Sequence, residues 1–326
     1  MAMSSNGTDD ERGYLAKIAR LYYHHEMNQR EIGRRLNISI ASVSRALNRA
    51  KEAGVVQISI DDTGDTFGEL EIAMETRWNL SECMVVPSTS GDVDAVFSDA
   101  LSYNAMARKT TELLSRILKG GDTVGVSWGK TLKHVGERLE PIGRTGVTVI
   151  PIIGAMGTVE TGIYPNSIAR EFAEKVGGTA YLVNTPAVVD SEEIRTSLQR
   201  DSAFQSVRRI WDNLGVILLS VSGLDEETSA FESGVFSADE LAEMRKAGGV
   251  CATNFSVLDA GGTHLDLPIS RRITNLPFPD LRNVPEVILI AGGRRKIAPL
   301  WAALRAGFVS KLITDEESAR ALTAPS

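Results

Sequence analysis

The chain has 326 residues, of which 43% are hydrophobic and 24% are charged. This composition is that of a soluble globular protein, and the length favours two domains, one of them large. No stretch approaches the roughly 20 apolar residues that a membrane-spanning helix needs, and the polar N-terminus lacks the apolar segment of a signal peptide. We therefore expect a cytoplasmic protein without membrane contact.

The net charge of −7 argues, taken alone, against a nucleic-acid partner. The charge is unevenly distributed, however, because residues 14–60 hold eight Lys or Arg against three Glu, a local charge of +5. Residues 61–326 carry −10. A small basic module joined to a large acidic body is expected where only the module contacts DNA.

The cysteines and histidines do not form a metal motif. Cys83 and Cys251 lie far apart in the sequence and define no disulfide framework. His24 and His25 are adjacent, so on a helix they point about 100° apart and cannot clamp one ion as an i, i+4 pair could. The sequence therefore predicts no metal site and no cofactor.

The chain begins with polar residues 1–13, which we expect to form a disordered tail. A helix is predicted next, over residues 14–26, from apolar residues at i, i+3, i+4 and i+7. These residues are Leu15, Ile18, Ala19 and Tyr22. Their common face would support the helices that follow.

The segment 28–49 reads as two short helices joined by a tight turn. Asn28 and Glu31 form a capping-box-like start. Asn37 suits the left-handed backbone of a turn, and Ser39 is a candidate N-cap for the second helix. The inward-facing residues of the second helix are predicted to be Val43, Leu47 and Ala50.

The opposite face of this second helix carries small residues and arginines. Small residues allow close approach to DNA, and arginines can reach phosphates or guanine edges. The pattern is typical of a helix-turn-helix whose second helix enters the major groove; the alternative is an ordinary helical hairpin with a solvated basic face. The predicted DNA-binding residues are Gln29, Arg30, Ser39, Ala41, Ser42, Ser44, Arg45 and Arg49.

Beyond the helix pair, Gly54 suits a left-handed helix cap. The β-branched segment 55–60 predicts a strand that would form a small wing beside the helices. Residues 61–66 are rich in turn formers and are a predicted linker. We therefore assign residues 1–60 to a winged helix-turn-helix domain and residues 67–326 to a second, larger domain.

The larger domain alternates short apolar strands with amphipathic helices, which predicts a mostly parallel sheet covered on both faces. This is a doubly wound, Rossmann-like α/β fold, in which ligands bind outside the carboxyl ends of the strands. The expected strands are Cys83–Val86, Thr123–Ser127, Val147–Ile153, Ala180–Val183, Val216–Val221, Val287–Ala291 and Lys311–Thr314. The expected helices are Phe67–Trp78, Asp94–Leu118, Thr131–Leu139, Ser167–Val176, Phe204–Asn213, Ala238–Ala247, Lys296–Ala306 and Asp315–Leu322.

Three loops at these strand ends are candidates for ligand binding. In residues 121–132 a strand is followed by Trp-Gly-Lys-Thr and a helix. Backbone N–H groups at the helix N-terminus, with a Lys and a Thr, can hold an anion such as a sugar phosphate. In residues 289–304 Lys296 opens a helix after two glycines and could neutralise a phosphate or bond sugar hydroxyls. The plainer interpretation of each is a turn with solvated side chains.

The third loop, residues 150–162, offers small residues that permit close backbone approach, namely Gly154, Ala155 and Gly157. Two further places are ambiguous. Asp259 is more readily a turn former than a ligand. Asn166 and Arg170 could contact a polar ligand, or they could cap a helix.

These segments together resemble the SorC family, also called SorC/DeoR, of bacterial sugar-responsive transcriptional regulators. The matching motifs, in the family's order, are QREIGRRLNIS…SVSRAL at 29–47, GDTVGVSWGKTL at 121–132, NSIAREFAEKVGG at 166–178, AGGRRK at 291–296 and LITDEESARALT at 312–323. The resemblance implies a sugar-sensing repressor or activator. It also implies a non-catalytic effector domain with a fold like those of glucosamine-6-phosphate deaminase and ribose-5-phosphate isomerase, phosphorylated sugars as effectors, and a homodimer or homotetramer.

Carried over to this chain, the resemblance assigns effector contacts to particular residues. The family often has an acidic sugar-binding residue where this chain has Ala252, and Asn254 is a candidate neutral substitute. Ile40 stands where many members place Arg or another polar residue, so we expect a different base preference. The predicted effector-binding residues are Ser127, Trp128, Gly129, Lys130, Thr131, Gly154, Ala155, Asn254 and Lys296.

A sugar-phosphate isomerase or deaminase is the competing interpretation. It needs a general base within reach of a substrate proton, for which Asp259, Asp190 and Glu160 are the candidates. None of them sits in a recognisable catalytic motif, so we expect no catalytic residues. The resemblance thus implies a regulator of a carbohydrate or polyol catabolic operon. Its partners would be double-stranded operator DNA and a sugar, polyol or sugar phosphate.

Overall fold

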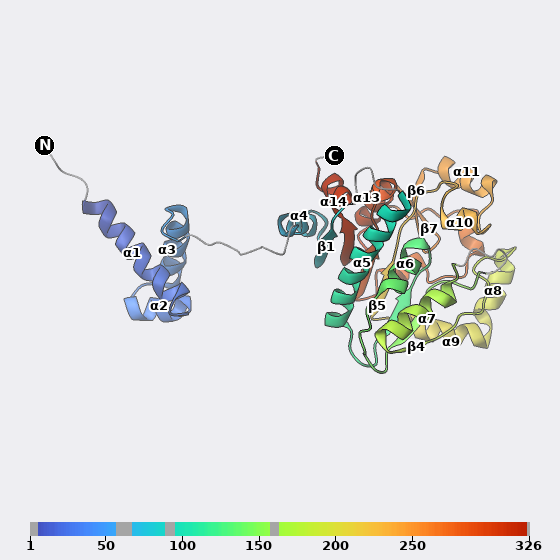
Figure 1. The fold of residues 1–326 in the computed structure, drawn as a ribbon, viewed down its shortest axis with the longest axis horizontal. Coiled ribbons are helices and arrows are strands. Elements are labelled where there is room, and N and C mark those ends of the chain that lie inside the picture. Colours follow the sequence, from blue (N-terminus) through green and yellow to red (C-terminus); the bar gives the residue numbers. More distant parts are fainter. Residues whose placement is uncertain (1–5, 57–66, 89–94, 157–162, 325–326) are drawn as a thin grey trace. The chain divides into compact units, whose positions relative to one another are not determined.

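The computed structural model describes residues 6–56, 67–88, 95–156 and 163–324 (Figure 1). The chain separates into two compact units, residues 1–66 and residues 67–326. Each unit has a core of its own. Among the described helices, none combines the length and apolar character needed to cross a bilayer.

The described part of the first unit consists of three helices, α1 (Asn6–Tyr23), α2 (Gln29–Leu36) and α3 (Ile40–Glu52). Helix α1 starts earlier than expected, so the prediction of a disordered tail was wrong for residues 6–13. Arg49 of α3 forms an ion pair with Glu11 of α1. This contact lies outside the apolar stripe that begins at Leu15, and it gives a physical reason for the longer helix.

The turn between α2 and α3 has the predicted geometry. Asn28 and Glu31 form a reciprocal capping box at the start of α2. Asn37 has a φ of 54°, in the left-handed region, and Ser39 accepts a hydrogen bond from the N–H of Ser42. The expected caps and turn of the helix-turn-helix are therefore confirmed.

The three helices enclose a small apolar core. Gly33 lets α2 approach the turn closely, because a Cβ at this position would lie 2.9 Å from the carbonyl oxygen of Ile38. The inward-facing residues of α3 are buried as predicted, and they pack against α1 and α2. The core residues are Leu15, Ile18, Ala19, Leu21, Ile32, Val43, Ala46, Leu47 and Ala50.

The segment after α3 is a helix cap in its described part. Gly54 has a φ of 64°, as expected of a left-handed cap. The N–H groups of Val55 and Val56 both donate to the carbonyl oxygen of Ala50, so these two residues close the helix and do not begin a strand. The rest of the predicted wing, residues 57–60, and the predicted linker, residues 61–66, lie outside the described residues.

The second unit is built on a seven-stranded parallel sheet with the strand order β1-β9-β8-β5-β2-β3-β4. Every strand expected within residues 67–326 is present, with ends shifted by a few residues. The strands are β1 (Glu82–Val86), β2 (Thr123–Val126), β3 (Thr148–Pro151), β4 (Thr179–Ala180), β5 (Val216–Leu219), β8 (Glu286–Ile290) and β9 (Lys311–Asp315).

Helices cover both faces of this sheet, which confirms the predicted α/β class (Figure 1). One face packs against α5 (Ala95–Ile117), α6 (Lys130–Arg138) and α7 (Pro165–Val176). The other face packs against α4 (Gly68–Trp78), α9 (Ser202–Trp211), α12 (Phe278–Leu281), α13 (Ile297–Arg305) and α14 (Glu316–Thr323). The remaining helical segments are α8 (Glu192–Arg200), α10 (Ser229–Glu232), α11 (Ala238–Lys246), η1 (Pro268–Arg272) and η2 (Arg294–Lys296).

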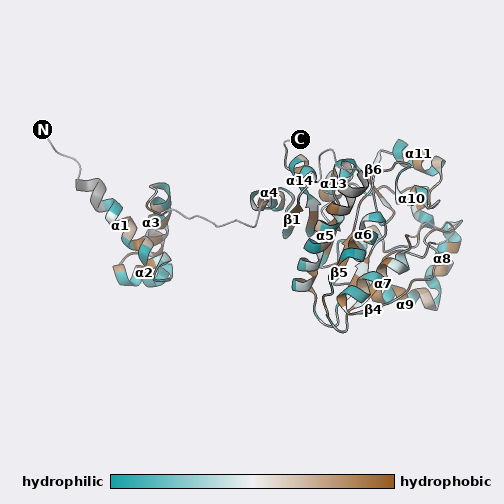
Figure 2. Cartoon of the chain, viewed as in Figure 1, coloured by the Kyte–Doolittle hydropathy of each residue, from teal (hydrophilic) through white to brown (hydrophobic). Residues whose placement is uncertain are grey.

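The middle residues of the inner strands are apolar because both of their faces are buried. In β5, Ile217 and Leu219 belong to the core on one side of the sheet, and Val216 and Leu218 belong to the core on the other side. Figure 2 shows the same distribution, with apolar residues on the strands and hydrophilic residues on the outer sides of the helices. This double burial explains why short continuous apolar runs identified the strands.

A two-stranded antiparallel hairpin, β6 (Gly249–Thr253) with β7 (Ser256–Asp259), lies outside the main sheet and was not predicted. Its two turn residues, Asn254 and Phe255, have φ values of 47° and 63°. Two left-handed residues are what a type I′ hairpin turn requires, and the usual signal is Asn-Gly or Asp-Gly. Here Phe255 takes the glycine position, so the signal is absent from the sequence.

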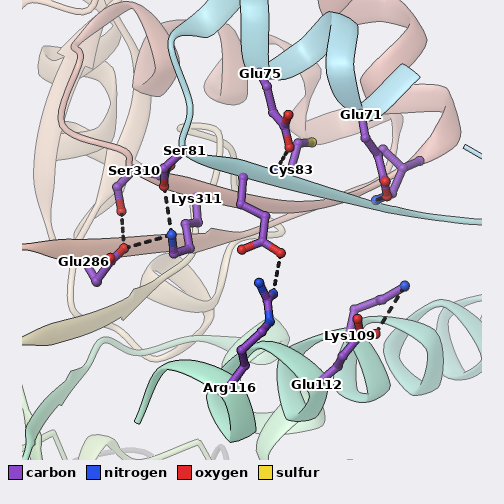
Figure 3. Close-up of polar contacts among 12 residues, drawn as sticks. Glu71, Glu75, Ser81, Cys83, Lys109, Glu112, Arg116, Glu286, Ser310 and Lys311 are labelled. Carbon is purple, nitrogen blue, oxygen red and sulfur yellow. Dashed lines mark hydrogen bonds and ion pairs between the residues drawn. The ribbon is translucent and has the colours of Figure 1, made fainter. Parts of the chain in front are cut away.

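Strand β1 lies at one edge of the sheet, and α4 covers its free side (Figure 3). The N–H of Cys83 donates to Oε1 of Glu75 at 2.8 Å, and the N–H of Val85 donates to Oε1 of Glu71 at 2.6 Å. Edge strands carry unpaired backbone groups that invite pairing with another chain. The two glutamates, four residues apart on α4, satisfy alternate N–H groups of this edge.

Candidate functional site

A pocket opens at the carboxyl ends of β2, β5 and β8. The chain continues from β2 to β3 and β4 on one side, and then returns to place β5 on the other side of β2. Ligands bind at such a reversal of strand order in doubly wound sheets. The pocket is lined by Tyr103, Ser127, Trp128, Gly129, Lys130, Thr131, Ile153, Ser220, Val221, Ser222, Gly223, Asp225, Glu227, Thr228, Ser229, Ala230, Ala252, Asn254, Phe255, Arg295 and Lys296.

The loop after β2 supplies one wall of the pocket. All five residues predicted there, 127–131, line it. Gly129 has a φ of 130° and is the N-cap of α6, so the loop turns sharply and the first N–H groups of α6 lie at the wall. The Trp128 indole donates to the carbonyl oxygen of Ile163 at 2.8 Å, which fixes the ring.

Lys296 joins the three loops that meet in the pocket. It lies on η2, just after β8, and its Nζ donates to Oγ1 of Thr131 at 2.6 Å and to Oγ of Ser220 at 3.2 Å. Thr131 belongs to the loop and helix after β2, and Ser220 follows β5. The structure therefore places Lys296, one of the predicted effector-binding residues, beside the Trp-Gly-Lys-Thr loop.

Two cations at the pocket are paired with carboxylates from the segment after β5. Lys130 forms an ion pair with Glu232 at 2.7 Å. Arg295 forms a two-pronged pair with Glu227, with Nη2 of Arg295 at 2.8 Å from Oε1 of Glu227. The hydrogen bond and the charge of Arg295 hold the pKa of Glu227 below its ordinary value, so this glutamate is ionised at neutral pH.

Asn254 lines the pocket, but its amide is used to hold the chain together. Its Oδ1 accepts a hydrogen bond from Oγ of Ser127 at 3.2 Å. Its Nδ2 donates to the carbonyl oxygens of Ile152 and Leu276 at 3.2 and 3.3 Å. The side chain is buried. These contacts favour a positioning role over the expected direct contact with a sugar hydroxyl.

Gly154 and Ala155 do not line the pocket, although their neighbour Ile153 does. The N–H of Gly154 donates to the carbonyl oxygen of Thr274, and the N–H of Ala155 donates to that of Thr185. A Cβ at Gly154 would lie 2.5 Å from the same Thr185 oxygen. The close approach that these small residues allow is therefore to the protein's own backbone. Gly157 lies outside the described residues.

The other ambiguous residues have structural roles or lie away from the pocket. Asp259 is a turn former, because its Oδ1 accepts the N–H groups of Gly261 and Thr263, each at 2.8 Å. The amide of Asn166 bonds both the N–H and the carbonyl of Val183. Arg170 and Asp190 are exposed and do not line the pocket. Glu160 lies outside the described residues.

The pocket wall that follows β5 was not predicted from the sequence. The motif Ser220-Val221-Ser222-Gly223 comes directly after a buried strand and leads into the polar segment 225–229. The strand-end rule that singled out the other loops applies here too and would have found it. The pocket lining combines Ser and Thr hydroxyl groups with the cationic side chains of two lysines and an arginine. These groups suit a ligand with several hydroxyls and a negative charge. Within the described residues, no three His, Cys, Asp or Glu side chains gather as a metal site would require.

The residues predicted to contact DNA lie on two helices: Gln29 and Arg30 begin α2, and the others belong to α3 or to its N-cap, Ser39. Arg30, Ser39, Ala41, Arg45 and Arg49 are exposed. The predicted residues that are partly buried are Gln29, Ser42 and Ser44. Ile40, at the start of α3, is 48% exposed, a large apolar side chain where a recognition helix meets base edges.

These two sites define a class of protein, a DNA-binding regulator with a ligand-binding body. Comparison with known families agrees. A family described as "Putative sugar-binding domain" matches residues 65–324, and a winged helix-turn-helix DNA-binding family matches residues 21–57. The deoxyribonucleoside regulator of Bacillus subtilis (strain 168) is 31% identical over 317 residues, 96% of this chain and 98% of the relative.

Two further relatives extend the comparison. The sorbitol operon regulator of Klebsiella pneumoniae is 28% identical over 320 residues, which cover 97% of this chain and 98% of the relative. The crystal structure of the full-length sorbitol operon regulator SorC from Klebsiella pneumoniae aligns with a TM-score of 0.73 at 26% identity. That alignment covers 97% of this chain and all of the other. The chain belongs to the SorC family of DNA-binding transcriptional regulators with a sugar-binding domain. Its relatives are transcriptional regulators and not enzymes, which removes the isomerase or deaminase alternative.

Proposed function

We propose that the protein controls a carbohydrate or polyol catabolic operon, as a repressor whose operator affinity is changed by a sugar, polyol or sugar phosphate. The observation that carries this proposal is the position of Lys296, which bonds Thr131 and Ser220 where the loops after three strands converge. A small ligand bound there would contact several separate elements of the body at once.

The chemistry of the pocket supports an effector with hydroxyl groups and an anionic group. The lining contains three cationic side chains, those of Lys130, Arg295 and Lys296. It also contains the hydroxyl-bearing residues Ser127, Thr131, Ser220, Ser222, Thr228 and Ser229. Relatives of the chain are named as a deoxyribonucleoside regulator, a sorbitol operon regulator and an erythritol catabolism regulatory protein. Their names agree with small polyhydroxylated effectors, phosphorylated or free.

On the DNA side, α3 is the proposed recognition helix. Arg45 is exposed on its outer face, and Ser39 and Ala41 are exposed at its start. The exposed Ile40 is suited to apolar contact with a thymine methyl group. We assign operator contacts to the full predicted set of Gln29, Arg30, Ser39, Ala41, Ser42, Ser44, Arg45 and Arg49.

The proposed active form is a homodimer or homotetramer in the cytoplasm. Helix-turn-helix proteins bind two half-sites one or more helical turns apart, so the geometry of the oligomer sets operator affinity. An effector changes that affinity only through its different affinity for two arrangements of the subunits.

A thermal-shift screen of the full-length protein tests the effector part of the proposal. Free sugars, polyols and sugar phosphates are compared at equal concentration, since a ligand that binds only the folded state raises the melting temperature by mass action. We expect stabilisation by a member of these classes, and a change of operator affinity by the same compound. A stabilising compound that leaves operator binding unchanged would contradict the proposal.

A further inference from the structure

We propose that Glu227 and Glu232 occupy the places of the effector's anionic group, so that an anionic effector must displace them and thereby loosen the segment that carries them. We call residues 225–232 the strap. This inference rests on the proposed function, because it concerns how the same pocket admits its ligand. It makes the two glutamates determinants of the affinity for anions.

The strap forms one wall of the pocket and bonds two other walls. Glu232 pairs with Lys130, in the loop after β2, at 2.7 Å. Glu227 holds the guanidinium of Arg295, after β8, with two hydrogen bonds. A third contact runs from the backbone N–H of Lys130 to Oγ of Ser229 at 3.4 Å. Glu227 and Glu232 thus both meet cations that line the pocket.

These ion pairs differ from several others on the body in the separation of their partners. The pairs Lys109–Glu112 and Lys133–Glu137 join neighbouring turns of one helix. The strap pairs join residues 102 and 68 positions apart, from different loops. Two such pairs come from one eight-residue segment, so the protein itself neutralises two of the three cations at the pocket.

The strap pairs are weak enough to exchange. The side chains of Arg295 and Glu227 are 68% and 67% exposed, and those of Lys130 and Glu232 are 44% and 43% exposed. Exposed ion pairs are screened by water and contribute little stability. A phosphate group offers more acceptor oxygens and more charge than a carboxylate, and arginine binds it with the same two-pronged geometry. An arriving phosphate can therefore replace the glutamates.

Two buried apolar residues hold the strap in place when its ion pairs exchange. Leu224, just before the strap, and Ala230, within it, belong to a buried apolar cluster that also includes residues of the hairpin β6–β7. The exchange frees the polar edge of the strap while these residues stay in place. Asp225 also contributes negative charge near Arg295, and its Oδ1 accepts the N–H of Glu227 at 3.1 Å. Asp225 therefore keeps the turn of the strap formed.

The test compares phosphate binding by the full-length protein and by a Glu227→Gln/Glu232→Gln variant. The probe is inorganic phosphate, titrated calorimetrically at constant ionic strength. The matched control is Glu174→Gln/Glu243→Gln, which removes the same charge from exposed positions outside both the strap and the pocket lining. Removing two exposed competitors should tighten phosphate binding by about fivefold to tenfold, with little change in the control.

Three results would overturn the inference. They are unchanged phosphate affinity in the strap variant, an equal gain in the control variant, and no phosphate binding by either protein. Hydrogen exchange gives a second readout, because phosphate should speed exchange of the amides of residues 225–232 in the unmodified protein; greater protection would contradict release. If free sugars still stabilise the protein while phosphate does not bind, the proposed function stands and the inference fails. If no sugar or sugar phosphate stabilises it, the proposed function fails.

Discussion

Ser127 donates a hydrogen bond to Asn254 at 3.2 Å, although the two residues lie 127 positions apart in the chain. Both side chains are buried. Asn254 stands at the turn of the β6–β7 hairpin, and Ser127 opens the loop that forms the pocket wall. The bond therefore fixes the wall against the hairpin, and the backbone carbonyls of Ile152 and Leu276 complete the shell of the Asn254 amide.

Replacing Asn254 with Gly should lower both stability and effector affinity. Glycine keeps the left-handed backbone, so the change removes only the amide and leaves buried partners unsatisfied. We expect a loss of about 1–3 kcal/mol in the free energy of unfolding, measured by urea denaturation. The control is Asn79→Gly, another left-handed Asn, at the exposed end of α4. Equal effects at the two positions would show that the Asn254 amide has no special role.

Arg45→Ala should weaken specific operator binding by about 1–3 kcal/mol if the guanidinium reads a base edge. Arg45 is exposed on α3 and bonds Oγ of Ser42 three residues earlier. Arg209 has the same exposed i, i−3 contact with Ser206, but lies on α9 of the body. Arg209→Ala is thus the matched control in an anisotropy titration with duplex DNA. Operator affinity that is equal in the two variants would remove Arg45 from the recognition surface.

Lys296→Ala should abolish or strongly weaken the effector response while sparing DNA binding. The lysine bonds Thr131 and Ser220 inside the pocket and lies in the ligand-binding unit. Loss of a charge-assisted contact with the effector should raise its dissociation constant about tenfold or more. Lys246→Ala, at an exposed position of α11, is the control. An unchanged effector concentration for release of DNA would show that the pocket assignment is wrong.

Removal of the carboxylates that cover β1 should destabilise the body. Glu75→Ala leaves the N–H of Cys83 without its acceptor and should cost about 1–3 kcal/mol, read from urea denaturation followed by tryptophan fluorescence. Glu75→Gln keeps an acceptor oxygen and should recover most of the loss. Glu69→Ala, exposed on the same helix, controls for helix propensity. If Glu69→Ala and Glu75→Ala unfold alike, the edge bonds of Figure 3 contribute nothing measurable.

The sequence could predict the elements that are set by burial on both faces or by contacts between neighbouring residues. The inner strands of the parallel sheet are buried on both faces, so each contains a short apolar run. The caps of the helix-turn-helix depend on residues only three positions apart. The β6–β7 hairpin could not be predicted in this way. Phe255 holds a left-handed backbone through packing with Trp128 and Phe236, and those contacts are distant in sequence.

The structure brings part of the predicted site together for the same reason. The loop 127–131 and Lys296 follow apolar strands, so the strand-end rule located them. Gly154 was misleading, because a glycine that lets backbone approach backbone has the same local sequence as one that admits a ligand. The roles of Glu227 and Glu232 depend on partners 68 and 102 positions away, which no local pattern reveals.

The most direct test of the central claim is fluorescence anisotropy of the full-length protein on a duplex from the upstream region of its own gene. The titration is run at several salt concentrations, with and without the compound that stabilises the protein most. We predict tight binding that weakens with salt, because phosphate contacts release counterions, and a shift in the dissociation constant when the compound is present. No preference over an unrelated duplex, or an affinity that the compound leaves unchanged, would contradict the account.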